Sequence, residues 1–352
     1  MNKKKFVDCF MLMGTALSLR GGEKLPEMGR PLIQDVFTTY VTLSFSLEEF
    51  NIDDIKNMNV EISGLLNQKW RDPRLGANVR TRKMAVAGQI WKPKVTNTEG
   101  RNTMCNNEDT MFWRGFGDEG DVLLSEKVKI ATKCTTNFNN FPYDTQFCEL
   151  KFGSYRFPEE EVSFIWDKYA VEYFTDTISN EFRIINITTY LKHDIRPSGN
   201  FSIAVIQIAI ERQNLHYLIC SITPCVLISL INYLTLWFDV NNRTSRLNLN
   251  FISFGVTLYF YYMSTCVLQP VSYFKALDIF TGVSLLFSVL SMLESLIVDS
   301  FCNAEEDIYH LKKRACRKEY PKSVYWLEML TKISVPCFYT FFISMYGSIY
   351  VK

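Results

Sequence analysis

The sequence has few of the residues that enzymes use. Its 352 residues include only three histidines, His193, His216 and His310, which lie far apart in the chain. It has no glycine-rich phosphate loop and no Cys/His cluster with the spacing of metal ligands. We therefore expect neither an enzyme nor a protein that needs a metal or another cofactor.

An excess of charge of one sign is also missing. The chain has 38 Lys and Arg against 37 Asp and Glu, a formal net charge of +1. This balance gives no indication of a nucleic-acid partner or an acidic partner. Hydrophobic residues make up 47% of the chain but are unevenly spread, because residues 21–214 have a soluble pattern and residues 215–352 are largely apolar. We expect two domains with this boundary.

The first residues have a composition of their own. Met1-Asn-Lys-Lys-Lys5 is followed by an apolar run that ends at Leu19. A basic start before a short apolar run predicts a signal peptide in residues 1–20. Asp8 interrupts the run, and an amphipathic N-terminal helix kept in the mature protein is the alternative.

Short segments typical of strands fill residues 21–214. Val36–Leu47 and Val60–Trp70 are rich in β-branched and alternating residues, and polar turns follow or precede them. No helical period is present. Strands at this spacing predict an immunoglobulin-like β-sandwich.

Cys134 and Cys148 enclose thirteen residues that contain Phe141-Pro-Tyr-Asp144. Strand-like segments lie on both sides, so the segment predicts a loop between two strands, stiffened by Pro142. The loop is more apolar than an ordinary surface loop, and we expect it to press against an apolar surface. Its aromatic residues are Phe138, Phe141, Tyr143 and Phe147.

This segment resembles the Cys-loop of the pentameric ligand-gated ion channels, and the pattern is most similar to glycine- and GABA-receptor-type subunits. The resemblance implies a Cys134–Cys148 disulfide in an extracellular domain, where it stays oxidised. Further motifs resemble the same family, although Lys94 stands where the family has an acid. These motifs are Trp70-Arg-Asp-Pro-Arg-Leu75, Trp91-Lys-Pro93, Gly153–Phe157 and Ser198-Gly-Asn-Phe201.

Four uncharged runs follow the β domain, and each is close to the roughly 20 residues that cross a bilayer. We expect a four-helix transmembrane bundle with spans at about 215–238, 246–268, 278–298 and 330–351. The third run, which includes Glu294, could alternatively be a buried helix of a soluble protein. Basic residues near Arg243 and in a short loop at about 299–325 predict that these linkers are cytoplasmic.

The expected location is therefore the plasma membrane, with several spans and the N-terminal domain outside. Asn186-Ile-Thr and Asn200-Phe-Ser would then be glycosylation sites. The role of Cys105 is left open.

The second span holds more polar residues than the others, which predicts that it lines a pore. Both flanks resemble the glycine and GABA receptors, in which an arginine begins the pore helix. Counted from this arginine, the residues that would face the pore are Arg246, Asn248, Ile252, Gly255, Tyr259 and Tyr262. We call this set the first register.

A register shifted by one residue would instead expose Leu249, Ser253, Val256, Phe260 and Met263. For the aromatic residues, packing between neighbouring helices is a further alternative.

The span has no acidic residue, and Arg246 lies at its cytoplasmic end. We interpret this as a preference for anions such as chloride. The alternative is that Arg246 only follows the positive-inside rule.

The resemblance also implies a site for a small-molecule agonist between subunits. Tyr155, Phe157 and Phe201 would supply part of an aromatic box. Leu65 and Lys127 would lie on the opposite face, although Lys127 could also be an ordinary solvated lysine.

Coupling between the domains would depend on Arg212, which directly precedes the first span. Its expected partner is Asp144, or else Asp53 and Asp54.

Together these features predict a subunit of a homo- or hetero-pentameric ligand-gated channel. Two alternatives remain at this stage. One is a family member that binds a ligand without conducting or conducts only in a mixed pentamer, and the other is a cation-selective channel.

Overall fold

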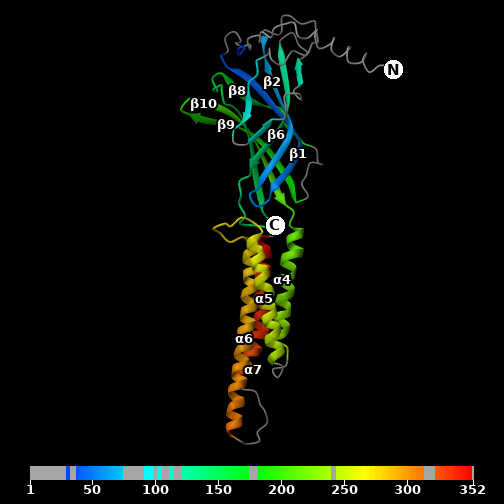
Figure 1. The fold of residues 1–352 in the computed structure, drawn as a ribbon, viewed down its shortest axis with the longest axis vertical. Helices are drawn as coiled ribbons and strands as arrows, with labels where there is room; N and C mark the ends of the chain where they lie inside the picture. Colours follow the sequence, from blue (N-terminus) through cyan, green and yellow to red (C-terminus); the bar gives the residue numbers. More distant parts are fainter. Residues whose placement is uncertain are drawn as a thin grey trace, which may run out of the picture.

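The computed structural model has a β domain at one end and a bundle of long helices at the other (Figure 1). The predicted signal peptide and Cys105 lie outside the described residues. The structure describes residues 29–31, 37–73, 91–98, 101–104, 111–114, 120–173, 181–238, 243–312 and 322–350.

Two sheets form the β domain, and the predicted β-sandwich is confirmed. The larger sheet has β8 (Val162–Tyr173) parallel to β1 (Thr39–Asp54), and its other neighbouring strands are antiparallel. On the other side of β1, the sheet continues through β2 (Asn59–Arg71) and β6 (Asp121–Lys133) to β4 (Arg101–Met104). The short strand β5 (Met111–Arg114) also pairs with β6. The smaller antiparallel sheet has the order β3 (Val95–Asn97), β7 (Thr145–Ser154), β10 (Gly199–Arg212) and β9 (Phe182–Arg196).

The hydrophobic core lies between these sheets. Alternate residues of β1 point inward, so that Leu43 is 0% exposed and Phe45 is 1% exposed. The Phe45 ring lies 5.8 Å from the ring of Phe152 on the other sheet. Gly64 makes room for this packing, because a Cβ at that position would lie 2.3 Å from the carbonyl oxygen of Ser46.

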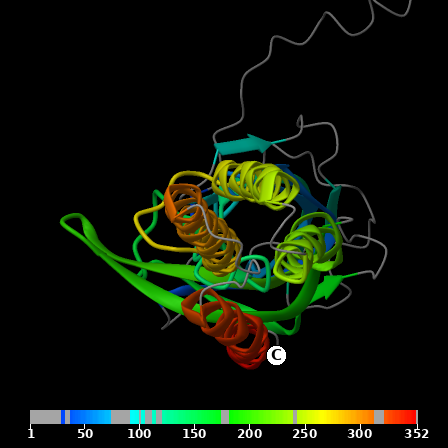
Figure 2. The same cartoon turned by 90° about the horizontal axis from the view of Figure 1, so that it is seen from below.

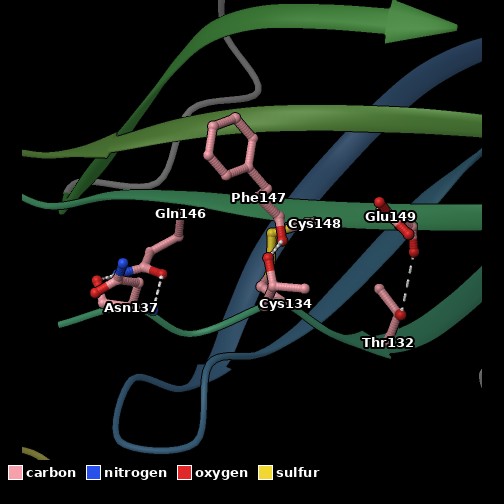
Figure 3. Close-up of a disulfide and its surroundings, with 8 residues drawn as sticks. Thr132, Cys134, Asn137, Gln146, Phe147, Cys148 and Glu149 are labelled. Carbon is pink, nitrogen blue, oxygen red and sulfur yellow. Dashed lines mark hydrogen bonds between the residues drawn. A yellow bond between two sulfur atoms is a disulfide. The ribbon is translucent and has the colours of Figure 1, made fainter.

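A disulfide between Cys134, just after β6, and Cys148, within β7, joins the two sheets (Figure 3). The loop that it closes is held from inside by Gln146, whose amide nitrogen donates to the Asn137 carbonyl oxygen at 2.9 Å. Phe138 and Phe141 of this loop are 2% and 0% exposed. The implied disulfide is thus present, and the loop is buried in part, because Tyr143 is only partly buried and Phe147 is 43% exposed.

Four helical segments follow the sandwich. The first segment consists of α3 (Leu215–Tyr217), a π-helical turn (Leu218–Ile222) and α4 (Thr223–Thr235), which follow one another without a break. The other three segments are α5 (Arg243–Cys266), α6 (Ala276–Lys312) and α7 (Lys322–Tyr350). Seen along the bundle, α5 and α7 lie on opposite sides, with α4 and α6 between them (Figure 2). Among the described residues, the stretches Leu215–Thr235 and Ala276–Phe301 are long and apolar enough to cross a membrane.

We predict that Cys134→Ser lowers the free energy of unfolding of the β domain by about 2–5 kcal/mol, because the link between the sheets is lost. The variant should fail to reach the cell surface as an assembled protein, which surface biotinylation would measure. Cys337→Ser is the control, since Cys337 is a free, exposed cysteine. Normal surface assembly of the Cys134 variant would contradict the prediction.

Candidate functional site

The boundary between the two domains holds a buried ion pair. Arg212, the last residue of β10, donates from Nε to one carboxylate oxygen of Asp144 at 2.8 Å and from Nη2 to the other at 3.2 Å. The two side chains are 0% and 1% exposed. Gln146 donates a further hydrogen bond to Asp144 at 2.6 Å. Such a bidentate, charge-assisted pair fixes the end of β10 on the Cys134–Cys148 loop.

Aromatic rings surround the guanidinium of Arg212. Its central carbon lies 4.4 Å from the ring centre of Phe182, 5.0 Å from that of Phe141 and 6.0 Å from that of Tyr217. Cation–π attraction compensates part of the lost hydration of the charge. Because Tyr217 belongs to α3, the cluster links the sandwich to the first helix.

The Cys134–Cys148 loop also caps the N-terminus of α6. The backbone N–H groups of Ala276 and Leu277 donate to the carbonyl oxygens of Asn139 and Phe141 at 2.9 and 3.0 Å. The first N–H groups of a helix have no partner within the helix, so these contacts satisfy two of them. The Phe138 N–H donates to the Tyr273 hydroxyl at 3.0 Å. Sequence reasoning missed these contacts, because backbone groups leave no signal in the residue types.

The alternative partners of Arg212 are not used. Asp54 closes its own turn instead, since its carboxylate accepts the Lys56 N–H at 2.9 Å and also bonds to Asn57. The hydrogen bond from the Asn57 side chain lowers the pKa of Asp54 most, and the backbone N–H groups of Lys56 and Asn57 lower it further, against an opposing effect of desolvation. Among the described residues, Arg212 has its ion pair with Asp144 alone, so the pairing with Asp53 or Asp54 was wrong.

The aromatic residues predicted for the agonist site lie where β7 ends and β10 begins. Tyr155 is 82% exposed. Phe157 is partly buried against Trp91 at 5.6 Å. Phe201 is only 5% exposed, and the Arg196 guanidinium lies 4.7 Å from its ring centre. Tyr155 is therefore the one member of the three with a largely open ring.

The other predicted ligand residues belong to the larger sheet. Leu65 on β2 is partly buried and pairs in register with Lys127 on β6. The Lys127 ammonium forms an ion pair with Glu48 at 3.0 Å. Among the described residues, no hydrogen bond, ion pair or ring contact joins this group to the Tyr155 group. The two predicted groups thus lie on different sheets of the chain.

The exposed face of α5 carries all but one of the predicted pore residues. A Cβ built on Gly255 would meet nothing within 4 Å, which agrees with an open position. The shifted register does not give one exposed face, because Ser253 is 6% exposed. The exposed members of the first register are Asn248, Ile252, Gly255, Tyr259 and Tyr262.

Arg246 does not share that face, which corrects its predicted position in the pore. Its side chain is 3% exposed and donates to both carboxylate oxygens of Glu294, at 2.6 and 2.8 Å. A third hydrogen bond reaches Glu328 at 2.8 Å. The physical reason is that a charge in an apolar bundle is stable only when paired, and these partners lie inside the bundle.

Most polar residues of α5 also point inward. The Asn250 amide donates to Ser295 at 2.7 Å and accepts from Thr235 at 2.9 Å. Thr257 contacts Ser288 at 3.2 Å. The polarity that predicted a pore helix therefore arises largely from contacts with α4 and α6.

Comparison with known proteins agrees with this architecture. Residues 23–214 match the family described as "Neurotransmitter-gated ion-channel ligand binding domain". The chain belongs to the Cys-loop receptor family. Its relatives include the rat and human glycine receptor beta subunits, each 26% identical over 301 residues, or 79% of this chain and 58% of the relative. The mouse gamma-aminobutyric acid receptor subunit gamma-3 is 22% identical over 340 residues, or 93% of this chain and 71% of the relative. This Cys-loop receptor chain thus spans little more than half the length of the glycine receptor subunits that it matches.

The two predicted glycosylation sites of this Cys-loop receptor chain are accessible. Asn186 on β9 and Asn200 at the start of β10 are both exposed. Whether they carry glycans stays a prediction.

We predict that Arg212→Gln lowers the free energy of unfolding by about 3–5 kcal/mol, because it leaves the buried Asp144 carboxylate without its cation. The melting temperature of the purified protein would measure the change. Asp54→Asn is the matched control at the same end of the domain, and it should change the melting temperature little. An unchanged melting temperature for Arg212→Gln would refute the importance of this pair.

Proposed function

We propose that this chain is a subunit of a pentameric ligand-gated ion channel of the plasma membrane. The observation that carries the proposal is the exposed face of α5, which holds Asn248, Ile252, Gly255, Tyr259 and Tyr262. A helix with tyrosine and asparagine on its outer face is stable in a membrane when it shares that face with copies of itself around a water-filled axis. The helices α4, α6 and α7 would surround the α5 ring.

In the proposed mechanism, an agonist binds between the half-site of Tyr155, Phe157 and Phe201 on one subunit and that of Leu65 and Lys127 on the next. Two half-sites on different sheets support a site shared between subunits. Motion of the sandwich would pass through Arg212 and Asp144 to α3, and through the Cys-loop carbonyl groups to α6. The agonist would thereby shift the population from closed to open states.

Selectivity for anions is part of the proposal. The α5 helix from Arg243 to Cys266 has no Asp or Glu, so the pore face would carry no ring of negative charge. Since Arg246 lies inside the bundle, the argument depends on the missing acidic ring and not on that arginine. Chloride is accordingly the proposed permeant ion, and a cation-selective channel is the alternative.

The first prediction of the proposal concerns assembly. The detergent-solubilised protein should be a ring of subunits, because a single α5 cannot bury its exposed face. Mass photometry or native mass spectrometry should give about five times the 41.0 kDa of one chain. A stable monomer or dimer would contradict it. Assembly only after co-expression with another family subunit would instead favour the obligately heteromeric alternative.

The second prediction concerns the gate. Gly255 has no side chain to narrow the pore, and the tyrosines one and two turns above it would close the pore by excluding water. Tyr259→Ala combined with Tyr262→Ala should therefore give a current without agonist, with a reversal potential that follows the chloride gradient. The parent protein should be silent under the same conditions. Whole-cell recording measures both.

Two other outcomes of this recording are informative. Silence of the double variant at normal surface level would argue against a tyrosine gate and would favour a non-conducting receptor. A current that follows the sodium gradient would leave the gate in place and would replace anion selectivity by cation selectivity.

A further inference from the structure

A cluster of four charged side chains lies in the half of the bundle that is far from the β domain. We call it the charge cluster, and it consists of Arg246 on α5, Glu294 on α6, and Glu328 and Lys332 on α7. Arg246 bonds to Glu294 through Nη2 at 2.6 Å and to Glu328 through Nη1 at 2.8 Å. Lys332 lies 3.4 Å from the second oxygen of Glu328. Three helices therefore meet at one guanidinium.

The charge cluster is buried at Arg246 and Glu294, is partly buried at Glu328 and Lys332, and has no net charge. The side chains of Arg246, Glu294 and Glu328 are 3%, 7% and 12% exposed, and Lys332 is 23% exposed. Two positive and two negative charges cancel. Removing one member would leave a buried charge without a partner, which costs far more than breaking a surface ion pair.

The charge cluster connects α7 directly to α5. Elsewhere α7 packs on α6, for example through Tyr346, whose ring lies 5.0 Å from that of Phe280. The two helices α5 and α7 lie on opposite sides of the bundle (Figure 2), so the long side chains of Arg246 and Glu328 meet in its interior. The end of α5 that begins the exposed face is thus tied to the last helix of the chain.

We propose that Arg246 is the anchor by which α7 fixes the far end of the pore helix, that Glu328 is the positioning residue on α7, and that the Arg246 charge takes no part in selecting ions. The position of the pore rests on the function proposed above. The anchoring itself rests only on the contacts of the charge cluster.

An exchange of charges tests the proposal. Arg246→Glu alone places a third carboxylate in the charge cluster, and the heated, detergent-solubilised protein should lose its assembled form at a temperature several degrees lower than the parent. Adding Glu328→Arg restores two positive and two negative charges with the guanidinium now on α7. The double variant should recover most of the lost heat stability, as fluorescence-detected size exclusion measures. Thr331→Val is the matched control on α7, because within the described part of the chain the Thr331 hydroxyl donates only to backbone carbonyl oxygens of its own helix.

The same exchange separates the anchor from a pore residue. It is made in the Tyr259→Ala, Tyr262→Ala background, and the reversal potential of the agonist-free current is compared with that of the background alone. The buried position predicts no shift, although position 246 now carries a carboxylate. A shift toward the sodium equilibrium potential would place residue 246 in the ion pathway and overturn the proposal.

The heat-stability measurement tests the contact between residues 246 and 328 even if no channel current is recorded. If the double variant is no more stable than Arg246→Glu alone, the pairing of residues 246 and 328 is refuted. If it recovers while the tyrosine background stays silent, the anchoring stands and the tyrosine-gated pore fails.

Discussion

The buried pair of Arg212 and Asp144 is the contact on which the junction of the two domains depends. A charge at this depth needs a fixed partner, so the end of β10 and the Cys134–Cys148 loop are held at one place. The loop can then offer its carbonyl groups to α6, and β10 can continue into α3 in the right direction. The aromatic rings of Phe141, Phe182 and Tyr217 lie around the guanidinium and help to keep water from the pair.

Much of this fold could be predicted from the sequence because its signals are local. Alternating β-branched residues predict strands, long uncharged runs predict helices, and the Cys134–Cys148 segment resembles one family in spacing and in its Phe-Pro-x-Asp motif. The partner of Arg212 was also predictable in part. Asp144 lies in a loop too apolar for a free surface, whereas Asp54 lies in a polar turn that can use its carboxylate locally.

The site on α5 could be predicted only in part, since a sequence gives the period of a helix but not which side faces a neighbour. The exposed set from Asn248 to Tyr262 followed from counting along the helix. Arg246 was assigned to the pore because it is charged and begins the helix, yet protein partners on α6 and α7 satisfy it, and the polar side chains of Asn250 and Thr257 likewise have partners on α4 and α6. Those partners are up to about eighty positions away along the chain, so no short pattern reveals them.

The cap that the Cys-loop places on α6 has a consequence for the kind of sequence change that this joint tolerates. Hydrogen bonds between backbone groups do not depend on side chains, so the exposed residue at position 139 can vary while the joint persists, whereas Ala276 is 0% exposed and leaves little room for a larger side chain. Proline is the exception, because it has no N–H to donate. In most helices a proline at the first position is harmless, since that N–H has no partner. At Ala276 the same replacement would remove one of the two backbone hydrogen bonds by which the loop caps the helix, and the bond from the Leu277 N–H to the Phe141 carbonyl oxygen would remain.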